Sequence, residues 1–416
     1  MEKILPQEAI KVAIKKLINR VFGVESPKKT SIKTTLLVSL LLAGSAKINR
    51  LAEQIKSEKT LFKGVQERIS RWLKDYDFVS QIQDFLLLDG AQKVSAGTTI
   101  AVDLSDFSKS FGGAKMEGAE RGYDGSDHTA HKFGHIFVVA GAINRHGERA
   151  TPLFVEMKQG RKGGKDLTQK AIKAAMDATR GNGILALDRG NDDENTIGFL
   201  QSNGYFAVVR QRHERDIFGN AKTIAQNLRE GVPEKTILIK NGKNIRGSVR
   251  FKLGQMALTG PILAVESQFE NVSITLFVTH PNLACANEKE LEKIAQSAAQ
   301  AYLDRWGIET FFRELKQNFK IEEARPRTFR ALNNLFMLSI LAHYFVKDFR
   351  SRPSRELSKI TKLIKDNFSQ INSKTFSFLQ NLRALFCEKS LKFISGRPKK
   401  PPKIAPKQLI FPFYPA

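Results

Sequence analysis

YLDRWGIETFFRELK, residues 302–316, has the periodicity of a helix with two chemically different faces. Four polar residues recur at positions i, i+3, i+7 and i+14: Tyr302, Arg305, Glu309 and Lys316. At roughly 100° per residue, these positions span an arc of about 60° on one side of a helix. Apolar residues gather on another side: Ile308, Phe311, Phe312, Leu315 and Phe319. The stretch predicts a helix that buries an apolar stripe and carries one carboxylate among an aromatic ring and two cations.

Simpler interpretations exist for single residues of this helix. Glu309 could form an ion pair with Arg305 or Arg313, one turn away on either side, as acids on exposed helices commonly do. Trp306 is expected to pack against the protein rather than to stack on a base. A functional role for Glu309 is favoured because two further acids in the chain occupy unusual positions.

These two acids follow apolar stretches that are typical of strands. Asp103 ends the apolar part of TTIAVDLSD (98–106), and Asp188 follows GILAL (183–187). Carboxylates at strand ends can meet at one edge of a sheet, and a helix packed on that sheet can supply a third. Two Asp and one Glu are hard oxygen ligands that suit Mg²⁺ or Mn²⁺. Two such ions can assist an in-line displacement at phosphorus.

Other acids close to these two are given structural roles. Asp106, three residues after Asp103, is expected to cap or turn the chain. Asp192 and Asp193 lie past the second strand, where the N-cap of a helix is the expected role.

The periodicity of the chain predicts an α/β protein with helical ends. The strands at 98–103, 135–142 and 150–157 are expected to form an antiparallel meander, followed by helix, strand, helix and strand. The predicted segments are 1–95 (helical), 96–212 (first part of the core), 213–287 (β-rich insertion), 288–350 (second part of the core), 351–392 (basic helices) and 393–416 (basic Pro/Lys tail).

One helix of the N-terminal segment is strongly basic. Residues 63–74 (KGVQERISRWLK) place Arg68 and Arg71 beside apolar positions at helical spacing. A basic helix in a compact helical unit is what a helix-turn-helix-like DNA-binding domain needs. An amphipathic helix with a solvated basic face explains the pattern equally well.

Together, the acids and the helix resemble bacterial insertion-sequence DDE transposases of the cut-and-paste type. The resemblance rests on Asp103 in AVDLSD, on Asp188 in ALDRG and on the Tyr-x2-Arg-x3-Glu-x6-Lys spacing at 302–316, which is similar to the YREK signature of that family. It covers about residues 98–350. It implies an RNase H-like core of the retroviral integrase superfamily, interrupted by a β-rich insertion and flanked by all-α regions.

The resemblance also implies a mechanism. Asp103, Asp188 and Glu309 would hold two Mg²⁺ or Mn²⁺ ions. Residues expected to contact DNA phosphates are Tyr302, Arg305 and Lys316, and further Arg210 and Arg212. The implied activity is metal-dependent DNA cleavage and strand transfer at terminal inverted repeats. Because two ends must be cut and joined together, a homodimer in a synaptic complex with double-stranded DNA is expected.

The composition agrees with a partner that is a polyanion. The 416 residues carry a net charge of +25 at pH 7, which concentrates nucleic acid around the protein. Cys285 and Cys387 are too few for a disulfide scaffold or a thiolate zinc site. No segment has the roughly 20 consecutive apolar residues that span a bilayer. We therefore expect a cytoplasmic, nucleoid-associated protein with no membrane partner.

Three other functions share part of this evidence. A metal-dependent nuclease without strand transfer would keep the same acids, and the sequence does not separate it from a transposase. A transposase-derived DNA-binding protein without catalysis, or a basic RNA-binding protein, would leave the three acids unexplained.

Overall fold

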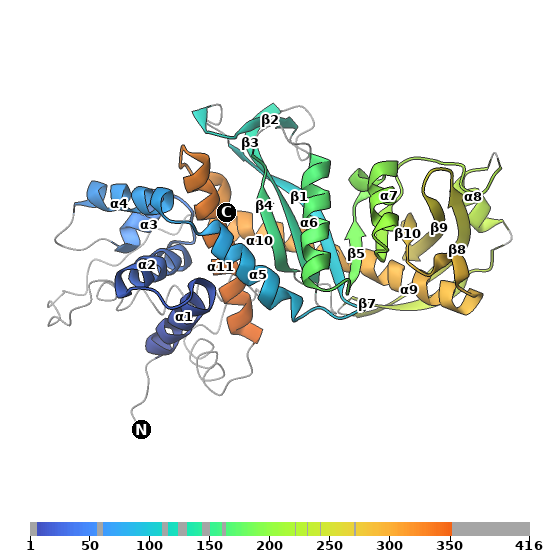
Figure 1. Cartoon of the computed structure of the whole chain (residues 1–416), viewed down its shortest axis with the longest axis horizontal. Helices are drawn as coiled ribbons and strands as arrows, with labels where there is room; N and C mark the ends of the chain where they lie inside the picture. The colour runs from blue at the N-terminus through green and yellow to red at the C-terminus, as the bar shows by residue number, and fades with distance from the viewer. Residues whose placement is uncertain are drawn as a thin grey trace, which may run out of the picture.

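The computed structural model describes residues 6–55, 61–109, 115–123, 131–143, 150–159, 164–220, 222–230, 232–241, 243–269 and 272–351. These residues form a mixed α/β structure, as expected. Helices gather at one end, a sheet with helices on both faces lies in the middle, and antiparallel strands lie at the far end (Figure 1). The basic helices expected beyond residue 351 and the tail at 393–416 fall outside the described residues.

The chain begins with helices that coincide with the apolar periodicity of the sequence. They are α1 (Pro6–Phe22), α2 (Pro27–Ala43), α3 (Ile48–Ile55), α4 (Phe62–Asp75) and α5 (Val79–Ala91). Pro27 begins α2, where the missing N–H is not needed. Gly44 ends it with a φ of 54°, a left-handed conformation that favours glycine.

One ten-stranded sheet runs through the described residues. Its strands are β1 (Thr99–Lys109), β2 (Glu120–Tyr123), β3 (His131–Ile143), β4 (Ala150–Met157), β5 (Ile184–Leu187), β6 (Ala207–Arg210), β7 (Lys235–Asn241), β8 (Lys243–Met256), β9 (Gly260–Phe269) and β10 (Val272–Thr279). Their order is β2-β3-β1-β5-β6-β10-β9-β8-β7, and β4 pairs with β3. The neighbours β1, β5 and β6 are parallel, whereas the other pairings are antiparallel.

β1 is longer than the sequence pattern predicts, and this corrects two expectations. It pairs with β3 as far as Lys109, so Asp103 does not end the strand. For the same reason, Asp106 lies within β1 and neither caps nor turns the chain. The parallel pairing of β1 with β5 stops at Val102, so Asp103 is the first residue of β1 beyond that pairing.

Residues 213–287, which the sequence predicts to be rich in strands, extend the same sheet. β10 pairs with β6, and β9, β8 and β7 follow in order. The short helix α8 (Ile224–Arg229) contacts β8 and β9. The core strands and the insertion therefore form one continuous β-sheet.

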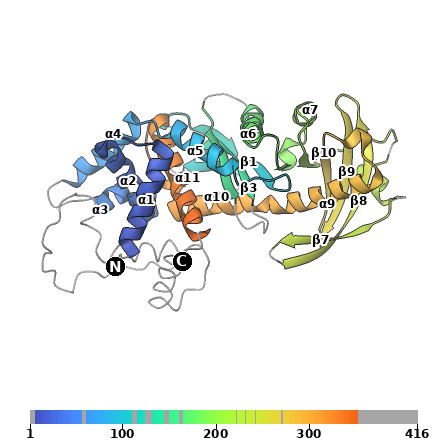
Figure 2. The same cartoon turned by 60° about the horizontal axis from the view of Figure 1, so that its bottom comes forward.

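Helices cover both faces of this sheet. α6 (Gly164–Ala178) and α7 (Glu194–Ser202) pack on one face. α9 (Glu288–Asp304) and α10 (Trp306–Phe319) pack on the other and follow one another beneath the sheet (Figure 2). Side chains alternate between the faces, so Ile100 and Val102 of β1 pack with α6 while Ala101 packs with α10.

The helix α11 (Phe329–Ser351) connects the N-terminal helices to the sheet. It packs on α2, α4 and α5, and its apolar residues belong to the core that includes α10 and one face of β1 and β3. Asn334 of α11 is buried at this junction and bonds to backbone groups of Leu73, Tyr76 and Phe78. The N-terminal helices thus share their core with the sheet-bearing part of the chain.

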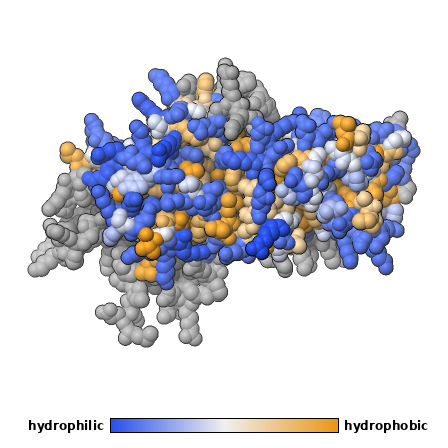
Figure 3. Space-filling view, viewed as in Figure 1, coloured by the Kyte–Doolittle hydropathy of each residue, from blue (hydrophilic) through white to orange (hydrophobic). Residues whose placement is uncertain are grey.

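The surface is largely polar in the view of Figure 3, over the N-terminal helices and over the β-rich end. No single described helix is long and apolar enough to cross a membrane. The pair α2 and α3 passes that test only jointly, with a bend of 108° between the two helices.

A buried carboxylate, Asp89 of α5, holds the junction between the N-terminal helices and α11. It pairs with Arg20 of α1, accepts a bond of 2.7 Å from Lys93, and accepts a hydrogen bond from the Tyr344 hydroxyl. Burial would raise the pKa of Asp89, but these donors and the charges of Lys93 and Arg20 lower it below its ordinary value.

Asp89→Asn is expected to destabilise the protein at neutral pH by about 1–2 kcal/mol. Because the pKa is lower in the folded than in the unfolded state, this contribution is present above about pH 4 and is lost as the pH falls further. Thermal unfolding of both proteins at pH 7 and in acid measures the difference. Asp84→Asn, an exposed acid of the same helix, is the control. A difference that does not change with pH would contradict this role.

Candidate active site

Three residues occupy one row across the parallel strands. In the parallel pairings, the last paired positions of β1, β5 and β6 are Val102, Leu187 and Val209. The next residue on each strand is Asp103, Asp188 and Arg210. The backbone of Asp188 stays extended (φ −80°, ψ 169°), so the alternation of side chains continues through it.

This alternation decides which face the row uses. On β5, Ile184 packs with α9 while Leu185 and Leu187 pack with α6. Asp188 therefore follows on the α9 side. The same count places Asp103 with Ala101, and Arg210 with Val208, on that side. The polar row thus faces the two helices that carry residues 302–316.

The stretch 302–316 is not one helix, which corrects the prediction from its periodicity. α9 ends at Asp304 and α10 begins at Trp306, with Arg305 at the junction. Arg305 keeps helical dihedral angles (φ −49°, ψ −33°), but the N–H of Ile308 bonds to its carbonyl three residues back. The turn is therefore tighter here than in an α-helix.

Arg305 lies among the acids and is almost completely buried, with 4% of its side chain exposed. Its guanidinium is 3.5 Å from Oδ2 of Asp103 and donates a 3.1 Å bond to Oε1 of Glu309. The ion pair with Glu309 that the helical spacing allows is present. Its arginine is buried, however, and the same guanidinium also reaches Asp103 on β1, whereas the Glu309 side chain is 42% exposed.

The site has a deficit of positive charge. Burial is the main cause that raises the pKa of Asp103 to about 7, and the negative charges of Asp188 and Glu309 raise it further. Arg305 opposes this shift but does not cancel it. Conversely, burial lowers the pKa of Arg305, yet Tyr302 and the three acids leave it raised. A divalent cation among these carboxylates would supply the missing charge.

Tyr302 closes the site from α9. It is buried, and its hydroxyl lies 3.5 Å from Oδ1 of Asp188. The side chain of Arg210 hydrogen bonds to Tyr302, and the guanidinium of Arg305 lies 5.4 Å from the centre of its ring. Burial raises the pKa of Tyr302, so its hydroxyl stays protonated and can donate.

Lys316 lies apart from this group. Its Nζ is 3.9 Å from Oδ1 of Asp106 and 3.3 Å from Oε1 of Glu322, which lies in the short 3₁₀ helix η4 (Ile321–Glu323). Asp106 is three residues further along β1 than Asp103. Lys316 therefore borders the acidic site instead of entering it.

Trp306 is exposed, which corrects the expectation that it packs. Its relative exposure is 55%, and Leu104, which follows Asp103, is exposed by 38%. The guanidinium of Arg305 lies 5.8 Å from the Trp306 ring. Helical spacing already indicates this exposure, because residue 306 lies opposite the buried stripe of α10 that includes Ile308, Phe311 and Leu315.

The donor set suits a hard divalent cation, although its members have not gathered around one point. Within the described ranges, no three His, Cys, Asp or Glu side chains are grouped closely enough to hold an ion as they stand. Asp103, Asp188 and Glu309 are oxygen ligands of the kind Mg²⁺ and Mn²⁺ prefer. The guanidinium of Arg305 lies between Asp103 and Glu309. The carboxylates would therefore have to rotate away from Arg305 to bind a shared ion.

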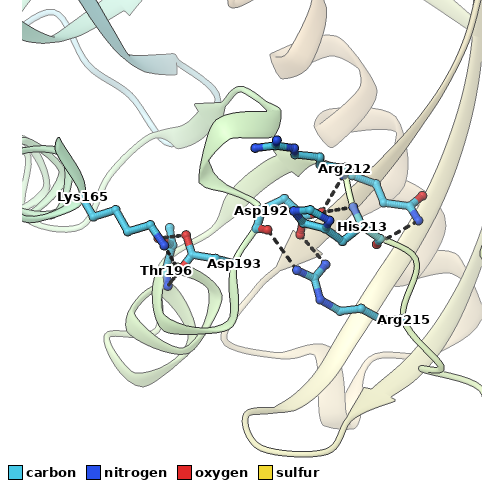
Figure 4. Close-up of polar contacts among 8 residues, drawn as sticks. Lys165, Asp192, Asp193, Thr196, Arg212, His213 and Arg215 are labelled. Carbon is cyan, nitrogen blue, oxygen red and sulfur yellow. Dashed lines mark hydrogen bonds and ion pairs between the residues drawn. The ribbon is translucent and has the colours of Figure 1, made fainter. Parts of the chain in front are cut away.

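Asp192, in the turn after β5, holds the segment that follows β6 in place. Asp188 leads into the 3₁₀ turn η2 (Arg189–Asn191), and Asp192 follows. Asp192 bonds to the backbone of Arg212 and His213 and pairs with Arg215 (Figure 4). The expectation that Asp192 is a helix cap is therefore wrong.

Asp193 does cap α7, as expected. Its side chain accepts the N–H of Thr196 at 3.2 Å and the hydroxyl of the same residue at 2.9 Å. Lys165 of α6 lies 3.3 Å from it (Figure 4).

The two arginines of the basic helix lie far along the chain from this site. Arg68 and Arg71 project from α4 and are exposed. The opposite side of α4 is buried through Val65, Ile69 and Leu73. The structure does not bring these arginines into the acidic site.

Two comparisons with known proteins find a match. The family model described as Transposase DDE domain matches residues 99–345. No curated protein matches the chain. Among solved structures, the cryo-EM structure of the piggyBac transposase synaptic complex with hairpin DNA is similar over 96% of this chain and 84% of that one, with 12% sequence identity and a TM-score of 0.41.

The family match begins at the first residue of β1 and ends within α11. It therefore includes the polar row of the parallel strands and both helices of residues 302–316, and it leaves out α1–α5. It also spans more than half of the 416 residues. The chain belongs to the Transposase DDE domain family.

Proposed function

We propose that this protein is a DNA transposase of a bacterial insertion sequence, which cuts DNA at the ends of its own element and joins them to target DNA. The observation that carries the proposal is that the buried Arg305 reaches both Asp103 and Glu309, with Asp188 in the row beside Asp103. Residues 302–316 supply the YREK signature across the α9–α10 junction. The parallel strands β1, β5 and β6, with antiparallel β3 beside β1, support an RNase H-like core.

The three acids would hold two Mg²⁺ or Mn²⁺ ions, which activate the attacking oxygen and stabilise the leaving oxygen when bound. Asp103 and Asp188 reach the site from neighbouring strands of a packed sheet, so their backbone positions are fixed. Glu309 reaches it from α10, whose apolar side is buried in the core. A rigid scaffold under all three ligands favours the reproducible geometry that phosphoryl transfer requires.

Phosphate groups of the DNA would be bound by donors around the acids. Arg210 and Tyr302 lie beside Asp188, Arg212 is exposed just beyond β6, and Lys316 borders the site near Asp106. Arg305 would bind a phosphate once its carboxylates turn to the metal. Positive and hydroxyl donors at these places fix a DNA strand and oppose the charge that develops at phosphorus.

Recognition of the element is assigned to the helical segment 1–95, with Arg68 and Arg71 on the exposed side of α4. The basic segments 351–392 and 393–416 add non-specific affinity through their charge. A homodimer would hold two ends in one synaptic complex, in the cytoplasm at the nucleoid. The β-rich segment 213–287 extends the sheet that carries Asp103 and Asp188.

Metal-dependent cleavage is the direct test. The protein is incubated with DNA that carries the inverted repeats flanking its gene, together with supercoiled target DNA, in Mg²⁺ and in EDTA. We expect cleavage at the repeat ends and joined products only with Mg²⁺. Cleavage without joining would indicate a nuclease, and specific binding without cleavage in either Mg²⁺ or Mn²⁺ would indicate a non-catalytic DNA-binding protein.

A further inference from the structure

Asp192 is not one of the three acids of the site, yet both of its carboxylate oxygens have bonding partners. Its side chain has no exposed surface. Oδ2 accepts the N–H of Arg212 at 2.6 Å and that of His213 at 2.9 Å. Oδ1 pairs with the guanidinium of Arg215, which also donates to the backbone carbonyl of Asp192 at 3.0 Å (Figure 4). One carboxylate therefore binds three residues of the segment that follows β6.

A single turn joins this carboxylate to Asp188. Within η2, the N–H of Asn191 bonds to the carbonyl of Asp188 at 3.0 Å, and the N–H of Asp192 bonds to that of Arg189 at 3.3 Å. Any movement of Asp192 therefore moves the turn that carries Asp188. The bonds of Asp192 therefore set the distance between Asp188 and the segment after β6.

That segment has little other regular structure. Residues 211–220 contain neither helix nor strand. Gln211 continues the pairing to β10 through a 2.9 Å bond to the carbonyl of Thr275. Arg215 lies 5.4 Å from the centre of the Phe277 ring on β10. Asp192 thus fixes the chain from Arg212 to Arg215 against both the turn after β5 and the surface of β10.

We propose that Asp192 is a positioning residue for DNA binding, which holds Arg212 in place to bind a phosphate next to Asp188. The inference rests on the proposed function. Arg212 uses only its backbone N–H for Asp192, so its exposed guanidinium is available to a phosphate. Arg215 is not such a contact, because Asp192 neutralises its charge and its side chain is only partly exposed.

The chemistry of the site requires a carboxylate at this position. Asp192 accepts hydrogen bonds at both oxygens, and every partner is a donor. Asparagine offers one acceptor and one donor. In either orientation, its amide group would face the two backbone N–H groups or the guanidinium of Arg215. Asp192→Asn should therefore release the segment even though its size is unchanged.

The test measures the affinity of the full-length protein for a short DNA duplex over a range of salt concentrations, without divalent metal. Asp192→Asn is expected to weaken binding about tenfold at low salt. The slope of log K against log salt should fall in magnitude by about 0.9, because the one phosphate contact of Arg212 contributes about that much. A loss of affinity would be informative, because Asp192→Asn removes one negative charge, and that change by itself would tighten binding to DNA.

Asp193→Asn is the matched control. It changes the charge by the same amount at the adjacent position, and it weakens the cap of α7 instead of the segment after β6. We expect a lower melting temperature and an unchanged salt slope. Asp192→Asn combined with Arg215→Gln restores a donor–acceptor match and the original net charge. This pair should recover the slope if the segment's position, and not the charge of residue 192, controls binding.

Two reference variants separate the possible failures. Arg210→Ala and Arg212→Ala should each reduce the slope by about 0.9. If neither does so, these arginines do not contact phosphates, and the proposed DNA contacts fail together with the inference. If both do so while Asp192→Asn, folded as judged by its melting curve, binds as the wild type does, the inference alone is overturned. Failure of the paired variant to restore binding would also overturn it.

Discussion

Glu309→Gln is expected to reduce DNA cleavage by about 10³-fold or more, with DNA affinity close to that of the wild type. Gln has the size of Glu but lacks the charge that a metal ligand needs. Metal ions contribute several kcal/mol to such reactions, and about 4 kcal/mol corresponds to a 10³-fold change in rate. Retained affinity follows because the substitution removes a negative charge and leaves the phosphate-binding donors in place.

Single-turnover cleavage of end-containing DNA in Mg²⁺ measures this effect, with binding assayed separately in EDTA. Glu288→Gln is the control, since it removes the same charge from an exposed position in the first turn of α9. That variant should cut at the wild-type rate. Equal cleavage by Glu309→Gln and the wild type would show that the assignment of the third acid is wrong.

Asn334→Leu should cause the largest loss of stability, about 3–5 kcal/mol. Nδ2 of Asn334 donates at 2.8 Å to the carbonyls of Leu73 and Tyr76, and Oδ1 accepts the N–H of Phe78 at 3.0 Å. These bonds join α11 to the link between α4 and α5. Leu has a similar volume and no polar atoms, so all three backbone groups would lose this partner in a buried place.

Thermal unfolding measures this loss as a decrease of roughly 6–10 °C in the melting temperature. Asn333→Leu, at the adjacent and partly exposed position, serves as the control and should change it little. Because α11 connects two parts of the core, we also expect limited proteolysis of Asn334→Leu to cleave first near residues 73–78. A melting temperature within 2 °C of the wild type, taken as roughly 1 kcal/mol, would contradict the role of Asn334.

Much of the architecture follows from local patterns. The helices of residues 6–91, the strands at 150–157 and 272–279, and the helix of residues 329–351 lie where apolar periodicity places them. Such periodicity reports which side chains can face a core, and this is a property of neighbouring residues. The choice of Asp103 and Asp188 also came from local sequence, because each acid directly follows buried strand residues.

The structure differs from the sequence predictions where a residue or strand far along the chain decides the local conformation. β1 continues past Asp103 because β3 pairs with it from the other side, and nothing in residues 98–109 reports that partner. Asp192 is not a cap because the segment after β6 takes its carboxylate. The stretch 302–316 is two helices because the chain tightens at Arg305. Each of these outcomes depends on sheet register or on packing between elements far apart in the chain.

The chemical groups of this protein and their spacing are a matter of sequence alone: three acids, a cluster of cations and a strong positive charge. Spacing along a helix or strand is a local property, so it could be read without the fold. Only the tertiary structure decided that Arg305 is shared between Asp103 and Glu309, and that Asp192 joins the turn of Asp188 to the arginines after β6. Parallel pairing brings the β1 strand beside β5, although Asp103 and Asp188 are 85 positions apart, and α9 and α10 pack on the same face of the sheet. Local periodicity does not encode either arrangement.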